Sequence, residues 1–104
     1  MRKPWVLGLA AFALGVFALA GAAYAQPVKI AFLSSLSGPF TPWGIQVRDG
    51  MKLAVAEINA AGGLLGRKVQ LVIRDDQSKP DVGVREARDL ILKEKVDFLT
   101  GIIH

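Results

Sequence analysis

Three short apolar runs, separated by two segments of helical periodicity, constrain the fold of this chain more than any other feature. The runs cover residues 28–33, 68–74 and 96–103. Each is nearly continuous rather than alternating, which is typical of strands that are covered on both faces. Helical periodicity fills 44–61 and 78–94. The order strand, helix, strand, helix, strand predicts an α/β fold with a parallel sheet and right-handed crossovers.

The first predicted helix has recognisable ends. Pro42 fits just before or within its first turn, and Asp49 is expected near the positive end of the helix dipole. Gly62 and Gly63 are expected to end it, because glycine adopts the left-handed cap conformation without penalty. The residues expected to face the sheet recur at three- or four-residue spacing: Val47, Met51, Ala54 or Val55, and Ile58.

The second predicted helix follows a polar turn. Ser78 is placed to cap it, and Asp81 three residues later resembles the second half of a capping box. The residues expected to face the sheet are Val84, Ala87, Leu90 and Ile91.

Residues 1–25 have the pattern of a secretory signal peptide. Arg2 and Lys3 precede an uncharged apolar stretch that ends in Ala23-Tyr24-Ala25, the small-x-small sequence preferred by signal peptidase. The stretch is also just long enough for a membrane anchor, but its many glycines and alanines weaken that alternative. No cysteine follows, which excludes a lipid-modified N-terminus. We expect cleavage after Ala25, leaving a mature chain that begins at Gln26 outside the inner membrane of a bacterium.

Charge and cysteine content exclude several classes of function. Two of the 13 basic residues lie in the leader, so the remainder carries 11 bases against 9 acids, and no basic stripe indicates nucleic-acid binding. The absence of cysteine excludes disulfides and thiolate metal sites. Gly38 and Gly44 lack the intervening glycine of a dinucleotide-binding loop. We therefore expect no cofactor and no metal.

The loop from Ser34 to Gly44 holds the candidate ligand-binding residues, namely Ser37, Gly38, Phe40 and Trp43. Parallel α/β sheets bind ligands beyond the carboxyl ends of their strands. Hydroxyls and free amides at a helix start can hold a carboxylate. Trp43 offers a large flat face to an apolar side chain or a cation. Alternatively, Phe40 and Trp43 simply plug the edge of the sheet.

No catalytic constellation is evident. Asp75 and Asp76 follow the second predicted strand, where adjacent carboxylates usually bind backbone amides or cap a helix. His104 is the sole histidine, and nothing in the sequence places it beside a nucleophile. The serines of the loop lack a G-x-S-x-G motif.

Several blocks together resemble one family. Residues 29–40, followed by Trp43-Gly44, resemble the opening of the branched-chain amino acid binding proteins, the type I periplasmic substrate-binding proteins of ABC importers. Residues 49–67 are similar to the family's first helix and following turn. Residues 74–80 resemble the end of its second strand, and 96–101 its third strand.

This resemblance implies two α/β lobes joined by hinge strands, with the ligand in the cleft and a closed form that docks on a membrane permease. Residues 26–104 would be a truncated first part of lobe I. By resemblance, Trp43 occupies the position whose ring packs on the ligand side chain, and the groups that grip the carboxylate follow the third strand, past His104. The resemblance leaves open a branched-chain or other amino acid, an amide, urea or an aromatic acid.

The sequence also leaves two alternatives to a solute-binding function, a ligand sensor and an enzyme. The same lobe also serves as the ligand-sensing ectodomain of receptors or amide-responsive regulators. The other alternative is a secreted α/β enzyme that uses Asp75, Asp76 or His104, but the sequence shows no catalytic arrangement of these residues.

Overall fold

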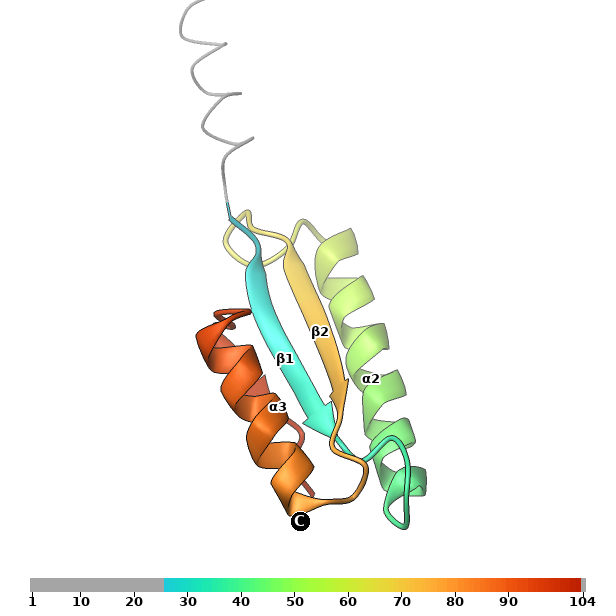
Figure 1. The fold of residues 1–104 in the computed structure, drawn as a ribbon. Coiled ribbons are helices and arrows are strands. Elements are labelled where there is room, and N and C mark those ends of the chain that lie inside the picture. The colour runs from blue at the N-terminus through green and yellow to red at the C-terminus, as the bar shows by residue number, and fades with distance from the viewer. Residues whose placement is uncertain (1–25, 104) are drawn as a thin grey trace, which may run out of the picture.

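The computed structural model describes residues 26–103 and confirms the expected α/β class. The elements in chain order are β1 (Val28–Ser34), α2 (Thr41–Ala60), β2 (Val69–Asp75), α3 (Pro80–Leu92) and β3 (Phe98–Thr100) (Figure 1). The signal peptide, its cleavage after Ala25 and any role of His104 lie outside the described residues and stay predictions.

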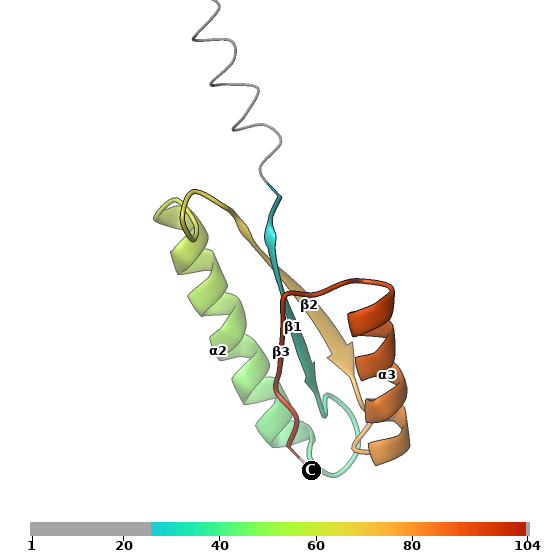
Figure 2. The same ribbon diagram turned by 90° about the vertical axis from the view of Figure 1, so that its left-hand side faces the viewer.

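The three strands form one parallel sheet in the order β2-β1-β3. The register of β1 and β2 runs from Val28 opposite Val69 to Ser34 opposite Asp75. The two helices lie on opposite faces of this sheet (Figure 2). α2 connects β1 to β2 on one side of it, and α3 connects β2 to β3 on the other side of β1. Two right-handed crossovers that run in opposite directions along a sheet place their helices on opposite faces. The prediction that both faces are covered is therefore confirmed.

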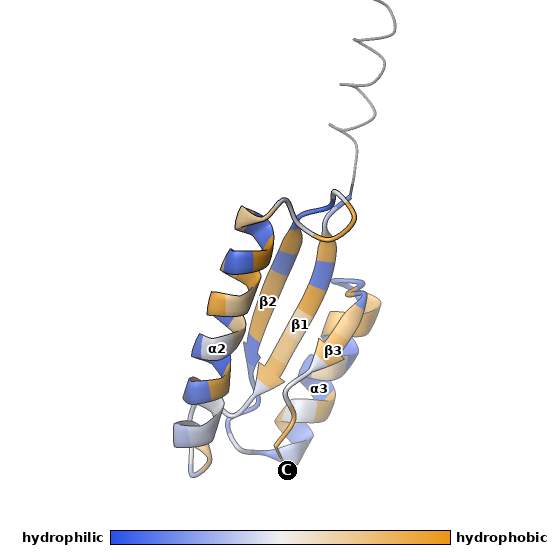
Figure 3. Ribbon diagram, turned by 180° about the vertical axis from the view of Figure 1, so that it is seen from behind, coloured by the Kyte–Doolittle hydropathy of each residue, from blue (hydrophilic) through white to orange (hydrophobic). Residues whose placement is uncertain are grey.

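The core sits mainly between β1 and α3. Ala31, Leu33 and Leu90 are fully buried there. Partly buried apolar residues from β2, α3 and the β3 region pack around them: Val72, Ala87, Val96 and Leu99. The strands are largely apolar along their length, as the hydropathy colouring shows (Figure 3). Burial on both faces thus accounts for the continuous apolar runs.

Contacts with the sheet and its loops position the two ends of α2. At its C-terminal end, the side-chain amide of Asn59 pairs with the backbone of Val69 as a neighbouring strand would. Asn59 Nδ2 donates to Val69 O (2.9 Å), and Asn59 Oδ1 accepts from Val69 N (2.8 Å). Gly62 and Gly63 follow with φ of +106° and +85°, which confirms the predicted glycine stop. At the opposite end, Gly44 is buried against Ser35. Both ends of α2 are therefore positioned by backbone groups of the sheet and its loops.

Some predicted boundaries are wrong. α2 begins at Thr41, one turn before Gly44, with Pro42 in its first turn. Asp49 consequently lies in the third turn, and the first turn holds no acidic residue, so the predicted dipole contact is absent. β3 ends at Thr100 rather than continuing to residue 103, because Gly101 adopts a φ of +107° that interrupts the extended backbone.

The helix faces also differ from the prediction. Val82 and Leu90 are the buried apolar residues of α3, whereas Val84 and Ile91 are 61% and 55% exposed. On α2, Val47 is likewise half exposed, but Met51, Val55 and Ile58 are partly buried as predicted, so Val55 rather than Ala54 belongs to the sheet-facing side. Helical periodicity gives the spacing of an apolar face but not its rotation about the axis, which the sheet determines by contact.

The predicted capping box is absent. The N-cap of α3 is Lys79, and no side chain caps the helix. Ser78 has a left-handed φ of +58°, which directs its hydroxyl away from α3.

Candidate functional site

Two loops meet beyond the carboxyl ends of β1 and β2. The β1–α2 loop covers residues 35–40, and the β2–α3 loop covers residues 76–79. They lie side by side because β1 and β2 are neighbours in a parallel sheet (Figure 1). The Asp76 amide donates to Ser34 O (2.9 Å), which continues the pairing of β1 and β2 past their last residue pair, Ser34 and Asp75.

Asp75 fastens these loops together. One carboxylate oxygen accepts from the amides of Leu36 (2.9 Å) and Gln77 (2.8 Å). The other accepts from the Ser37 hydroxyl (2.6 Å). Asp75 therefore binds backbone amides on both loops, as the structural interpretation of the acidic pair predicted.

Asp76 makes a second, buried connection. Its Oδ1 accepts from the Ser35 hydroxyl (2.6 Å) and from the Ser78 amide (2.9 Å). Both Ser35 and Asp76 are fully buried. Asp76 therefore connects the two loops through a buried side-chain hydrogen bond and holds the backbone of its own turn.

The pKa of Asp75 reflects its partners. Burial raises the pKa of this carboxyl. The Ser37 hydroxyl and the backbone amides of Gln77, Leu36 and Ser37 stabilise the charged form and outweigh burial, so the pKa of Asp75 lies below its usual value. A carboxyl whose pKa is lower in the folded than in the unfolded state stabilises the fold above the unfolded pKa. That stabilisation is lost as pH falls through the folded pKa.

Replacing Asp75 by asparagine is expected to lower the free energy of unfolding near pH 6 by about 1 kcal/mol, since the carboxyl is partly solvated. The difference from wild type should begin to shrink as pH falls below about 4, and it should close only below the lowered pKa of the folded wild-type carboxyl. Urea unfolding of the mature protein between pH 6 and pH 3 measures both effects. Asp81→Asn, at an exposed position, serves as the control. A constant difference between wild type and Asp75→Asn across this range would contradict the linkage.

The hydroxyls of the site are donors to the protein rather than to a ligand. Ser35 and Ser37 donate to carboxylates. Thr41 donates to Gly38 O (2.6 Å), and Ser78 donates to Ser37 O (2.8 Å). A hydroxyl has one proton, so toward solvent these groups act only as acceptors. In this arrangement the four hydroxyls have no proton left for a ligand carboxylate, and the expectation that hydroxyls and free amides of this loop hold one stays a prediction.

Phe40 and Trp43 form an exposed aromatic pair beside these loops. Their ring centroids are 6.1 Å apart, with the planes tilted by 52°. Trp43 lies in the first turn of α2 and is 57% exposed, and Phe40 is 36% exposed. Trp43 consequently does not plug the edge of the sheet, and its ring is accessible to solvent beside the β1–α2 loop. We call the exposed residues Ser37, Gly38, Phe40 and Trp43 the rim of the site.

The four candidate residues all lie in the β1–α2 loop or in the first turn of α2. Ser37 and Gly38 are exposed in the β1–α2 loop, next to Phe40 and one turn from Trp43. Gly38 has a φ of +82°, and a Cβ there would lie 2.8 Å from Ser78 Oγ. The sequence assigned Ser78 to capping of the second helix rather than to this site, because neither Gln77 nor Ser78 is a glycine that would signal a left-handed turn.

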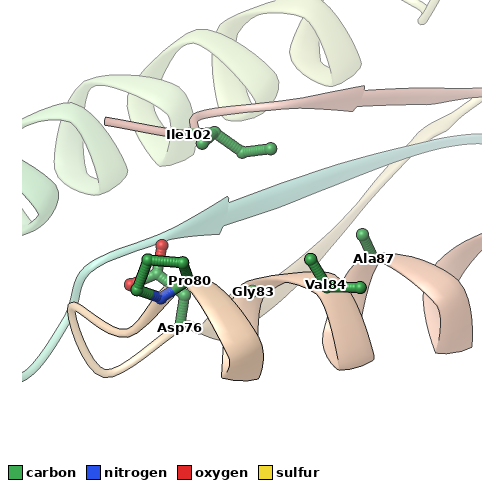
Figure 4. A pocket seen from close by; sticks show the side chains of 6 residues that line it. All are labelled: Asp76, Pro80, Gly83, Val84, Ala87 and Ile102. Atoms are coloured by element: carbon green, nitrogen blue, oxygen red, sulfur yellow. The ribbon is translucent and has the colours of Figure 1, made fainter. Parts of the chain in front are cut away.

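A separate small pocket of about 230 Å³ opens beside α3. Its lining residues are Asp76, Pro80, Gly83, Val84, Ala87 and Ile102 (Figure 4). None of the four candidate residues lines it. One of its lining residues, Asp76, belongs to the β2–α3 loop and also accepts hydrogen bonds from Ser35 and Ser78.

Residues 26–103 lack two features that would indicate other kinds of function. Across this part of the chain no helix has the length and apolar character needed to cross a membrane. The same residues contain no group of three or more histidine, cysteine or acidic side chains arranged to hold a metal ion.

Comparisons with known proteins agree on one family. The family model described as periplasmic binding protein matches residues 27–104. A Leu/Ile/Val-binding protein homolog of Brucella melitensis is 37% identical over 94% of this chain and 26% of its own length. The Leu/Ile/Val-binding protein of Escherichia coli is 39% identical over 81% of this chain and 23% of its own length. The chain thus spans about a quarter of the length of these relatives.

Solved structures give the same result. The branched-chain amino acid transporter substrate-binding protein LivJ of Streptococcus pneumoniae, in complex with isoleucine, matches with a TM-score of 0.71 and 33% identity, over 72% of this chain and 22% of that one. A solute-binding protein of an ABC transporter from Rhodopseudomonas palustris, in complex with benzoate, matches with a TM-score of 0.63 and 33% identity, over 75% and 21%. The parallel α/β fold, the family model and these relatives together show that the chain belongs to the periplasmic binding protein family and is similar to its Leu/Ile/Val-binding members.

Proposed function

We propose that residues 26–104 form the first part of lobe I of a two-lobed solute-binding protein. This protein captures an amino acid of the branched-chain type, or a related small carboxylate, in the periplasm and delivers it to the permease of an ABC importer. The observation that carries the proposal is the accessible ring of Trp43, held beside a hydrogen-bonded loop at the carboxyl end of a parallel sheet.

The chemistry of the rim supports this division of labour. Trp43 and Phe40 offer apolar faces to a ligand side chain. The Ser37 hydroxyl donates its proton to Asp75, so it can accept an N–H group but cannot donate to a carboxylate. We place the donors to the ligand carboxylate outside the described residues, as the family resemblance implies. The isoleucine and benzoate complexes of the two similar structures support a small carboxylate as ligand.

A binding function also fits the acidic pair. Asp75 and Asp76 hold amides and hydroxyls of the two loops. We therefore propose no catalytic residue. A ligand that contacts both lobes would favour the closed form by its differential affinity, and that form would dock on the permease.

Replacing Trp43 by alanine is expected to weaken ligand binding at least tenfold, because an exposed aromatic anchor supplies much of the contact area. The affinity of the complete mature protein for L-leucine, L-isoleucine, L-valine and benzoate would be measured by isothermal titration calorimetry. Trp43→Phe should retain part of the affinity. Leu53→Ala removes another exposed apolar side chain of α2 and should leave affinity unchanged. Equal affinity of Trp43→Ala and wild type would remove Trp43 from the site.

A further inference from the structure

Ser78 connects the two loops at the candidate site. Its hydroxyl donates to Ser37 O (2.8 Å) and accepts from the Phe40 amide (3.2 Å). Both partners belong to the β1–α2 loop, whereas Ser78 belongs to the β2–α3 loop. One side chain thus binds the two ends of the segment from Ser37 to Phe40.

The middle of that segment also contacts Ser78. A Cβ at Gly38 would lie 2.8 Å from Ser78 Oγ and 2.9 Å from both Ser78 Cβ and Gln77 O. Such distances are shorter than van der Waals contact, so only glycine fits between the loops at this point. Three of the four candidate ligand-binding residues, Ser37, Gly38 and Phe40, therefore have their positions fixed by Ser78.

The backbone around Ser78 is strained. Gln77 and Ser78 have φ of +57° and +58°, a region that is unfavourable for residues other than glycine. Asp76 offsets this cost, because its Oδ1 accepts from the Ser78 amide and its carbonyl from the Lys79 amide (2.9 Å each). The strained turn places the Ser78 hydroxyl on the β1–α2 loop instead of on the first turn of α3.

We propose that Ser78 is a positioning residue for ligand binding. It holds the Ser37–Phe40 segment, and with it the start of α2 that carries Trp43, in the binding conformation before the ligand arrives. This inference rests on the proposed solute-binding function. Its physical basis is preorganisation: a loop that is already ordered loses less conformational entropy when the ligand binds.

The test compares two variants of Ser78 in the complete mature protein. Ser78→Ala removes both hydrogen bonds and keeps the strained backbone. Ser78→Gly also removes them but relieves the strain, since glycine adopts positive φ freely. We expect both variants to bind the tightest ligand among L-leucine, L-isoleucine, L-valine and benzoate about tenfold more weakly. We expect the free energy of unfolding to fall less in Ser78→Gly than in Ser78→Ala.

Asn59→Ala provides the matched control. It also removes two hydrogen bonds between α2 and the β2 region, but at the opposite end of the sheet. It should lower stability and leave affinity unchanged. If wild type binds a ligand and both Ser78 variants bind it within twofold of wild type, the proposal for Ser78 is overturned while the binding function stands. Equal affinity loss in Asn59→Ala would overturn it as well. If wild type binds none of the four compounds, the proposed function itself fails.

Discussion

Gly44→Ala is expected to lower the free energy of unfolding by about 3 kcal/mol or more. A Cβ at this position would overlap the carbonyl oxygen of Ser35 and lie 2.6 Å from its carbonyl carbon. Neither atom belongs to a side chain that could rotate away. Ser35 itself is fully buried and bound to Asp76, so the loop cannot shift without losing that hydrogen bond. The start of α2 would have to move off the sheet.

Gly50→Ala is the matched control for this prediction. Gly50 lies in the same helix, and a Cβ there would have no atom within 4 Å. Alanine is the better helix former, so this change should stabilise the protein by roughly 0.5–1 kcal/mol. Urea unfolding of the mature protein gives both values. Similar effects of the two substitutions would show that α2 does not approach Ser35 as closely as the structure has it.

Asp76→Ala is expected to destabilise the protein by about 3 kcal/mol. The change removes the acceptor of the Ser35 hydroxyl and of the Ser78 amide. Ser35 is fully buried, so its hydroxyl would lose a partner where water cannot replace it. The strained turn at Ser78 would also lose a hydrogen bond that offsets its backbone cost.

Two further substitutions at acidic positions make this test specific. Asp76→Asn keeps an oxygen acceptor and should destabilise less than Asp76→Ala. Asp81→Ala removes an exposed carboxylate from the first turn of α3 and should cost less than about 0.5 kcal/mol. Thermal and urea unfolding rank the three variants. The buried role of Asp76 would be contradicted by a ranking in which Asp76→Ala and Asp81→Ala have similar stability.

The strands and helices were predictable because their signals are local. Continuous apolar runs such as 28–33 indicate buried strands, and Gly62-Gly63 ends a helix through its own conformational freedom. The rotation of each helix was not predictable in this way. Val84 and Leu90 are equally apolar in the sequence, yet Leu90 is fully buried and Val84 is 61% exposed. The difference arises from which side of α3 meets Ala31 and Leu33.

At the candidate site, the sequence located the loop that carries Ser37, Gly38, Phe40 and Trp43, because loops after parallel strands bind ligands. It did not identify Ser78 as part of that site. The local pattern of Ser78 and Asp81 resembles a capping box, and this favoured the wrong partner. Ser78 contacts residues about 40 positions earlier in the chain, which no local spacing indicates.

The sequence by itself therefore determined the order of elements, the parallel α/β class and the position of the candidate loop. Only the tertiary structure decided how that loop is held. The register that sets Ser34 opposite Asp75 brings Asp75, Asp76 and Ser78 alongside residues 35–40. Apolar periodicity and glycine stops depend on neighbouring residues, whereas hydrogen bonds between two loops depend on strand register. Register is fixed only when the whole sheet forms.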